Sequence, residues 1–345
     1  MNGYPIRFVP IYQERVWGGR RLESVYGRVL PGTVPIGESW EISDRDEASS
    51  VVANGPWTGL SLSELVARHA SALMGDAPLR RGRFPLLVKI LDAREILSLQ
   101  VHPPADRAEG LGGEPKSEMW FFTGADPGSE ILAGLRPGTT RESFQRELSA
   151  GTVERCCHRI PVVPGDAMML PSGRVHAIGA GLLLFEIQEN SDTTFRVFDW
   201  NRVGLDGKPR PLHVRESLAS IDFEDHAPRL VETAWSVPAA DTADTATTGF
   251  SSRLLAAQES FRVEAHRGPS GARWIRKLAR CLIVGVVRGS LRVGDGPDAV
   301  RLGAGDFCLV PASMGCVTAT LECEAEWLTA VPGPFPERDG GAPAG

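Results

Sequence analysis

The sequence predicts an all-β protein of two sandwich or barrel domains with short helical insertions. Three observations favour this fold class. Glycine (38 residues) and proline (26 residues) exceed their usual shares and interrupt short apolar runs. Only two stretches have convincing helical periodicity. A length of 345 residues is typical of about two domains.

The expected strands are short apolar runs that end at turn residues. Runs of this length are typical of a sandwich or a barrel. They are Phe84–Ile90, Ile96–His102, Met119–Phe122, Ala167–Leu170, Gly181–Ile187, Leu282–Val287 and Phe307–Val310.

Two helices are expected as insertions beside the β core. In Ser61–Met74, apolar residues recur at three- and four-residue spacing, and Ser63 can cap the helix. In Thr140–Ala150, Thr140 offers a cap, and Phe144 and Leu148 lie four residues apart.

A change in composition predicts the domain boundary. Residues 236–248 are small and polar and have almost nothing to bury, which is typical of a linker or an exposed loop. We therefore expect a first domain over 1–235, with the helical insertions, and a C-terminal domain over 249–333. The Pro/Gly-rich residues 334–345 are expected to form a flexible tail.

Charge and hydropathy exclude two classes of partner. The net charge is -6 and the signs are interspersed, so no basic stripe favours nucleic acid. No apolar run approaches the 18 or so residues of a membrane helix, and the first residues lack a secretion signal. We expect a cytoplasmic protein without a membrane partner.

The six cysteines argue against a thiolate metal site. They are irregularly spaced, and no Cys-x-x-Cys pair occurs. Any metal must therefore be held by histidines and carboxylates.

A short internal repeat indicates two copies of one β unit. Residues 165–171 (GDAMMLP) are matched 140 residues later by residues 305–311 (GDFCLVP), each a turn, a strand and a proline. Chance similarity of two β-hairpins is the alternative. The first copy continues to His176 with a glycine–proline–glycine–histidine spacing that resembles the second motif of the cupin barrels, in which the histidine binds metal. The second copy has Cys316 at that position, so this barrel is expected to lack metal.

Further candidate ligands lie upstream. In a strand, Gln100 and His102 face the same side, and Pro103 ends the strand near a barrel rim. Glu118 lies sixteen residues after His102, and in an extended segment its side chain points to the same side as that of Lys116. Gln100, His102, Glu118 and His176 form a set of nitrogen and oxygen ligands suited to zinc or another borderline divalent metal. Taken singly, a histidine such as His102 is more often a hydrogen-bonded core residue than a ligand, and charges such as Lys116 and Glu118 more often form a solvated strand edge.

With these motifs the chain resembles a known family, the type I mannose-6-phosphate isomerases in their shorter bacterial form. The resemblance covers roughly residues 1–225 and implies two cupin (jelly-roll β-barrel) domains, the first catalytic and the second degenerate. The matching segments are Val16–Gly19, Gly37–Glu41, Pro85–Ile90, Leu97–Pro103, Pro115–Trp120 and Asp192–Asp199.

The resemblance also implies roles for single residues. One zinc ion per chain is expected on Gln100, His102, Glu118 and His176. Arg196 is expected as the active-site arginine, with Lys116 and Asp192 flanking the sugar. The implied reaction interconverts D-mannose 6-phosphate and D-fructose 6-phosphate through a cis-enediolate, with a hexose 6-phosphate as the small-molecule partner.

The chemistry of that reaction agrees with the residue types. A proton moves from carbon 2 to carbon 1, so the site needs an electrophile, an acid/base group and positive charge for the enediolate. Lys116 is one candidate for the acid/base group, but the sequence leaves its identity open. Asp192 reads equally as a structural ion-pair partner of Arg196.

Five more residues are expected near the substrate, and three of them have a plainer alternative. Trp17 and Trp40 can pack in the core instead of lining the pocket, and Lys89 can extend outward to solvent. The expected set is Trp17, Glu38, Trp40, Lys89 and Ser98.

Two rival functions stay open. Another metal-dependent cupin enzyme, such as a dioxygenase or a different sugar-phosphate isomerase, would share the ligands and differ in its pocket. A non-catalytic sugar-binding cupin would lack the metal. We expect a monomer or a weak homo-oligomer.

Overall fold

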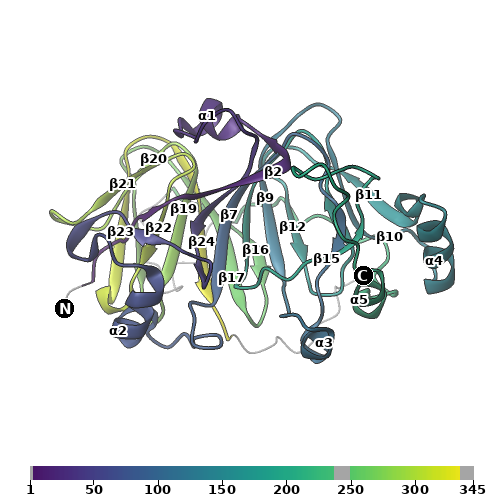
Figure 1. Cartoon of the computed structure of the whole chain (residues 1–345). Coiled ribbons are helices and arrows are strands. Elements are labelled where there is room, and N and C mark those ends of the chain that lie inside the picture. The colour runs from purple at the N-terminus through teal and green to yellow at the C-terminus, as the bar shows by residue number, and fades with distance from the viewer. Residues whose placement is uncertain (1–2, 237–248, 335–345) are drawn as a thin grey trace. The chain divides into compact units, whose positions relative to one another are not determined.

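The computed structural model describes residues 3–236 and 249–334 (Figure 1). The expected linker (236–248) and tail (334–345) lie outside the described residues, apart from Ser236 and Pro334. The described residues cluster into two compact units. One, here called the 88–231 unit, comprises Tyr12–Trp40 and Val88–Val231. The other, here called the C-terminal unit, comprises the described parts of Met1–Ile11, Glu41–Leu87 and Glu232–Gly345.

Two antiparallel sheets carry the 88–231 unit. The six-stranded sheet has the order β12-β9-β14-β7-β2-β3, and the five-stranded sheet has the order β11-β10-β13-β8-β15. The six strands are β2 (Ile11–Gly19), β3 (Ile36–Ile42), β7 (Leu86–Ala93), β9 (Glu118–Ala125), β12 (Ala167–Leu170) and β14 (Leu182–Glu189). The five are β8 (Leu99–Val101), β10 (Glu130–Leu135), β11 (Cys157–Pro161), β13 (His176–Ile178) and β15 (Phe195–Phe198).

The C-terminal unit is also built on two sheets. Their orders are β16-β17-β24-β19-β22 and β18-β23-β20-β21. An apolar cluster around Trp274 and Trp327 forms its core. The strands are β16 (Ser251–Ala257), β17 (Phe261–Gly268), β18 (Arg273–Lys277), β19 (Leu282–Arg288), β20 (Ser290–Val293), β21 (Val300–Gly303), β22 (Phe307–Val310), β23 (Cys316–Leu321) and β24 (Ala325–Pro332). Short pairs β1 (Phe8–Val9) with β6 (Val51–Val52), and β4 (Asp44–Arg45) with β5 (Ala48–Ser49), complete the strands.

All seven expected strands are present, five of them with shifted ends. The strand expected over 96–102 is β8, which covers only Leu99–Val101. Leu97 therefore lies before the strand and packs with Trp17 instead of sharing the face of Leu99 and Val101. Strand alternation over the expected range 96–102 would put Leu97, Leu99 and Val101 on one face, which is wrong for Leu97.

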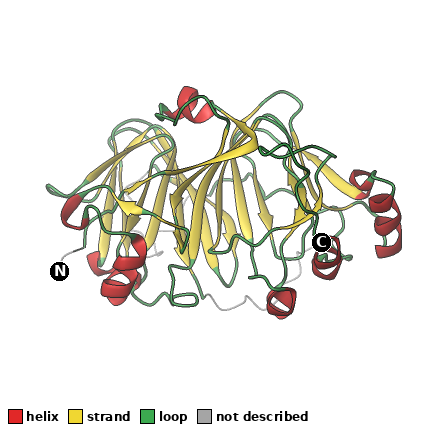
Figure 2. Ribbon diagram, in the orientation of Figure 1, coloured by secondary structure: helices red, strands yellow, loops and turns green. Residues whose placement is uncertain are grey.

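The helices are few and short (Figure 2). Helix α4 (Arg141–Ser149) begins after Thr140, whose side chain accepts from the Ser143 amide, so the expected cap is confirmed. Helix α2 (Leu62–Met74) is also confirmed, but its cap is Ser61 rather than Ser63. Ser61 is extended and forms a reciprocal capping box with Glu64. The sequence did not indicate α1 (Arg21–Tyr26), α3 (Ala105–Ala108) or α5 (Val214–Ser220).

The internal repeat corresponds to one structure made twice. Gly165 and Gly305 have φ of 94° and 81°, and each is followed by an aspartate. Asp166 Oδ2 accepts from an amide three residues back at 2.9 Å, and Asp306 Oδ2 does the same at 2.9 Å. The strands that follow, β12 and β22, pair with β9 and β19 in the same way. Chance similarity of two hairpins does not account for this match.

In the described part of the chain, no helix is long and apolar enough to cross a membrane.

Candidate metal centre and active site

Strand register places three polar side chains side by side. Strand β8 lies between β13 and β15, and Gln100 pairs with His176 on one side and with Arg196 on the other. Directly paired residues point to the same face of a sheet. His176, Gln100 and Arg196 therefore form a row across the five-stranded sheet.

A second group of ligand atoms meets this row. Glu118 begins β9 in the six-stranded sheet, and His102 follows the end of β8. Glu118 Oε1 lies 3.2 Å from His176 Nε2, and Oε2 lies 3.4 Å from His102 Nε2. Ligand atoms of the three residues all fall within 4.8 Å of one another. Gln100 joins them, because its Nε2 lies 3.2 Å from His176 Nε2.

Backbone carbonyls orient both imidazoles. His102 Nδ1 lies 2.8 Å from the carbonyl oxygen of Thr193, and His176 Nδ1 lies 2.9 Å from that of Arg174. These bonds fix the proton on Nδ1 and leave Nε2 with its lone pair toward Glu118. Metal-binding histidines are commonly held in this way.

The donor set fits a divalent metal. His102 Nε2 and both carboxylate oxygens of Glu118 are buried, and none has a partner in hydrogen-bonding geometry among the described residues. Buried polar atoms without partners are costly unless a ligand satisfies them. Two imidazoles, one carboxylate and one amide match the N/O preference of zinc and similar ions.

The protonation states also suit metal binding. Burial lowers the pKa of His102 to about 3, helped by the nearby Lys116, and burial lowers the pKa of His176. Burial alone would raise the pKa of Glu118, but Lys116 and the two histidines hold it well below its usual value. Both imidazoles are thus neutral and the carboxylate is ionised at neutral pH, the forms that bind metal.

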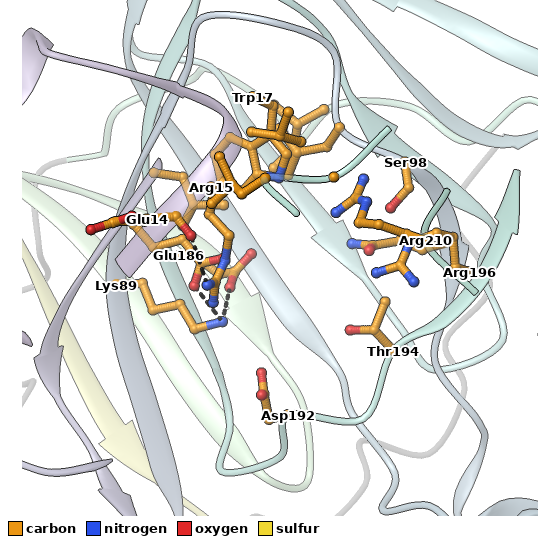
Figure 3. Close-up of a pocket in the computed structure, with 18 of the residues that line it drawn as sticks. Glu14, Arg15, Trp17, Lys89, Ser98, Glu186, Asp192, Thr194, Arg196 and Arg210 are labelled. Atoms are coloured by element: carbon orange, nitrogen blue, oxygen red, sulfur yellow. Dashed lines mark hydrogen bonds and ion pairs between the residues drawn. The ribbon is translucent and has the colours of Figure 1, made fainter. Parts of the chain in front are cut away.

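A cavity of about 560 Å³ opens above this centre (Figure 3). The candidate ligand Gln100 and the neighbouring Lys116 both line this cavity. Lys116 Nζ lies 2.9 Å from Glu118 Oε2. The predicted site residues on its wall are Trp17, Glu38, Lys89, Ser98, Gln100, Lys116, Asp192 and Arg196. Lys116 and Glu118 are 4% and 0% exposed, so the solvated-edge interpretation is wrong.

Trp40 does not reach the cavity wall. Its Nε1 donates to Glu38 Oε2 at 2.7 Å, and its ring lies 5.3 Å from Lys89 Nζ. The indole is 2% exposed and packs behind Glu38, which is the packing alternative. Trp17 combines both interpretations, because it packs in the core and lines the cavity.

Lys89 points inward and forms a buried network, so outward extension to solvent is wrong. Its Nζ lies 3.2 Å from Glu186 Oε1 and 3.8 Å from Glu38 Oε2. Burial opposes the charge, but Glu186 and Glu38 raise the pKa of Lys89 above its usual value. Arg15 Nε donates to Glu38 Oε1 at 2.7 Å. Despite burial, Lys89 and Arg15 lower the pKa of Glu38 to about 2.

Asp192 and Arg196 do not form the structural ion pair that the sequence left open. Among the described residues no ion pair joins them, and Asp192 is exposed at the cavity wall. Arg196 instead donates from Nη1 to the Pro211 carbonyl at 2.9 Å.

Sequence reasoning missed five charged residues of the cavity wall, Glu14, Arg15, Glu186, Asp206 and Arg210. Glu186 is the one acid within the otherwise apolar residues 182–187 of β14. A buried acid needs a partner, so this position could have been recognised from the sequence as a candidate site residue. Arg15 directly precedes the Val16–Trp17 motif. Arg210 lies in a loop that has no regular pattern, so nothing marked it.

The chain is similar to known isomerases. The family model described as "Phosphomannose isomerase type I, catalytic domain" matches residues 6–119. The mannose-6-phosphate isomerase of Streptococcus mutans is 34% identical over 299 residues, which cover 86% of this chain and 89% of that protein. Mannose-6-phosphate isomerase ManA of Bacillus subtilis is 34% identical over 317 residues, covering 91% and 95%. A crystal structure of the Bacillus subtilis mannose 6-phosphate isomerase superposes with a TM-score of 0.83 at 29% identity, covering 95% of this chain and 99% of that one.

Proposed function

Because the chain belongs to the type I phosphomannose isomerase family, we propose that it interconverts D-mannose 6-phosphate and D-fructose 6-phosphate with one zinc ion per chain. The observation that carries this proposal is the buried group of His102, Glu118 and His176, in which His102 Nε2 and both Glu118 carboxylate oxygens have no hydrogen-bond partner among the described residues. Gln100 is the fourth proposed ligand. Phosphorylated hexoses do not cross membranes, so the proposed place of action is the cytoplasm.

The fold supports the proposal at a coarser level. The strand-rich units each contain two antiparallel sheets, and the repeated turn and strand occur once in each. We propose that each unit is built on a cupin barrel.

Register explains why only one unit is proposed to bind metal. The repeat aligns Leu170 with Val310, and their partners across the sheet are Glu118 and Leu282. His176 pairs with Gln100, whereas Cys316 pairs with Lys277. Leucine, cysteine and lysine at these positions do not reproduce the N/O ligand set.

The proposed reaction moves two protons within the sugar. A base removes the proton from carbon 2 of the open-chain aldose and a proton returns to carbon 1, while the hydroxyl proton of O2 passes to O1, so no oxidant is needed. When bound, the zinc ion supplies Lewis-acid polarisation of the sugar oxygens. Lys116 lines the cavity beside Glu118 and is our candidate for the group that moves the proton.

Two further side chains would act on the sugar. Arg196 lies next to Gln100 in the strand row, where its charge stabilises the negative enediolate. Asp192 is exposed at the cavity wall and can accept a proton, or a hydrogen bond from a sugar hydroxyl.

Paired variants at the two equivalent strand starts test the proposal. His176 begins β13 and Cys316 begins β23. We expect His176→Ala to lose both zinc and isomerase activity, the latter by more than ~100-fold, because outer-shell changes alone cost that much. Cys316→Ala should keep both. Metal content by elemental analysis and fructose 6-phosphate formation without oxygen are the measurements. Loss of metal in Cys316→Ala, or oxygen consumption during turnover, contradicts the proposal.

A further inference from the structure

Two consecutive residues, Gly173 and Arg174, contact both candidate histidine ligands through their backbone. The amide of Gly173 donates to the carbonyl of His102 at 2.9 Å. The carbonyl oxygen of Arg174 lies 2.9 Å from His176 Nδ1. The direction of a metal-binding imidazole depends on such outer contacts. A displacement of residues 173–174 would therefore reach both histidines.

The side chain of Arg174 is held by all three nitrogens of its guanidinium group. Nε and Nη2 each donate to Asp225 at 2.7 Å, one to each carboxylate oxygen. Nη1 donates to the Met169 carbonyl at 2.7 Å. The side chains of Arg174 and Asp225 are 15% and 16% exposed, so water screens this pair only in part. Because a bidentate pair fixes the plane of the guanidinium group, the position of Arg174 depends on that of Asp225.

Asp225 belongs to a segment that is itself bonded to the ligand-bearing sheet. Residues 221–227, here called the strap, follow helix α5. The amide of Asp222 donates to the Gly173 carbonyl at 2.9 Å, and the amide of Leu135 in β10 donates to the Asp225 carbonyl at 2.8 Å. The strap is thus joined to residues 173–174 and to β10, and it forms a fixed support for the Asp225 carboxylate.

Gly173 is the point at which the strap approaches the ligands most closely. Its φ is 92°, a conformation that favours glycine. A Cβ at this position would lie 3.4 Å from the Ser220 carbonyl oxygen and 3.5 Å from Asp222 Cβ, so the strap is in van der Waals contact with it. The backbone of Gly173 therefore bonds His102 on one side and the strap on the other.

The structure assigns Arg174 no direct contact with the substrate. Neither Arg174 nor Asp225 lines the cavity above the metal centre. The charge of Arg174 is matched by the carboxylate of Asp225, so it offers no free cation to a sugar phosphate. Its contact with the site is made by its carbonyl on His176 Nδ1.

We propose that Arg174, anchored by Asp225, is a positioning residue for the metal: it holds its carbonyl on His176 Nδ1 and so keeps Nε2 of that ring aimed at the metal. This inference rests on the proposed function, because it requires a metal on His102, Glu118 and His176. Asp225 acts through Arg174 and touches neither metal nor sugar. The expected effect is therefore on metal affinity.

The zinc Kd of chelator-treated protein, measured by competition with a chromophoric chelator, tests this proposal. Asp225→Asn keeps the shape of the side chain and removes its charge, and Arg174→Gln removes the guanidinium group. Each should raise the zinc Kd about 10-fold, the lower end of the range for outer-shell changes. Arg159→Gln is the matched control, because Arg159 of β11 pairs with Glu130 of β10 in the same sheet and is 52% exposed. Its zinc Kd should stay within about twofold of that of wild type.

A double-mutant cycle separates positioning from simple support of the fold. Arg174→Gln with Asp225→Asn should bind zinc no more weakly than the worse single variant, because both residues act through one contact. Asp225→Glu, which keeps the charge, should recover part of the lost affinity, and Arg174→Lys is the milder variant at the other position. Variants that lose free energy of unfolding but bind zinc as tightly as wild type show a merely structural pair and overturn the proposal. Additive losses of zinc affinity overturn it as well.

Turnover of the zinc-loaded wild type separates this proposal from the isomerase assignment. If the zinc Kd rises in the Arg174 and Asp225 variants but wild type forms no fructose 6-phosphate from mannose 6-phosphate, the positioning role stands and the isomerase assignment fails. If wild type isomerises and the variants bind zinc as tightly as it does, the isomerase assignment stands and the positioning role is overturned.

Discussion

At the residue scale, Lys89 shows how the site depends on balanced buried charge. It is 4% exposed and lies between Glu186 and Glu38. The two carboxylates are also buried, at 3% and 8% exposed. Burying three such groups is tolerable only because they compensate one another. The network therefore stabilises the cavity wall as a unit, and removing its cation leaves two acids without their shared partner.

We predict that Lys89→Met lowers the free energy of unfolding by about 3 to 5 kcal/mol, the cost of breaking a buried charge pair. Urea denaturation measures the change. Lys277→Met serves as the control, because Lys277 is exposed and its loss should cost less than about 0.5 kcal/mol. A Lys89→Met protein within 1 kcal/mol of wild type, on the order of one ordinary hydrogen bond, would show that the charges are not coupled.

His266 is a second buried titratable group, in the C-terminal unit. Its Nδ1 lies 2.8 Å from Ser252 Oγ, its Nε2 lies 2.9 Å from Thr329 Oγ1, and its ring stacks on Trp327. Burial lowers its pKa to about 4, although Glu264 acts in the opposite direction. The unfolded chain therefore binds the proton first as the pH falls.

From this depressed pKa we predict acid lability that His266→Gln removes in part. The contribution of neutral, buried His266 to the free energy of unfolding is fully present above pH ~6.5. It is lost as the pH falls toward about 4, and amounts to a total on the order of 3 kcal/mol. Unfolding free energy should therefore fall less steeply over this window in His266→Gln than in wild type. His158→Gln is the control, since that side chain is only partly buried. Parallel pH profiles for wild type and His266→Gln would refute the assignment.

The spacing of the candidate metal ligands could be predicted from the sequence, but the residues that surround them could not. Gln100 and His102 share a strand face by parity alone, and a proline fixes the end of the strand. His102 satisfies both interpretations, because Nδ1 bonds a carbonyl while Nε2 is left for a ligand. The partners of Glu186, Lys89 and Trp120, come from segments far apart in sequence, and spacing carries no information about such contacts.

At the scale of elements, the repeated turn is the most informative feature. Gly165 and Gly305 occupy the same backbone conformation before equivalent strands, and each turn is closed by the same pair of backbone bonds to the neighbouring strand. A side chain is disfavoured there because φ is positive. The two glycines should therefore be equally sensitive to substitution.

We predict that Gly165→Ala and Gly305→Ala each lower the unfolding free energy by about 1 to 2 kcal/mol, the cost of a left-handed conformation for alanine. Thermal or urea unfolding measures both. Gly110→Ala is the control, because Gly110 has no positive φ and open space around it, so no loss is expected. If only one of the two variants were destabilised, the repeat would not have the same structural role in both units.

Sequence patterns predicted which segments form strands better than where they end. Buried runs such as Ala167–Leu170 and Phe307–Val310 matched β12 and β22 to the residue, because turn and proline bound both ends. No such stop precedes β8, and its start was placed three residues too early. Helix α2 was found, but its cap is Ser61 rather than the expected Ser63, because the Ser61 side chain accepts a hydrogen bond from the Glu64 amide.

At the scale of the whole molecule, the described residues form two units, each with its own apolar core, and they contain one cluster of candidate metal ligands. The ligand cluster and the cavity belong to the 88–231 unit. The C-terminal unit repeats the turn and the strand, while its register positions hold Leu282, Lys277 and Cys316. A single functional metal per chain follows from the proposed function.

Titration of chelator-treated protein with zinc, followed by formation of fructose 6-phosphate from mannose 6-phosphate, tests this requirement most directly. Metal-free protein should be inactive, because the proposed electrophile is absent. Activity should then rise linearly and reach its plateau at about one zinc per chain, as one closed ligand set demands. Full activity in protein shown by elemental analysis to contain no metal, or a plateau at two equivalents, would contradict the account.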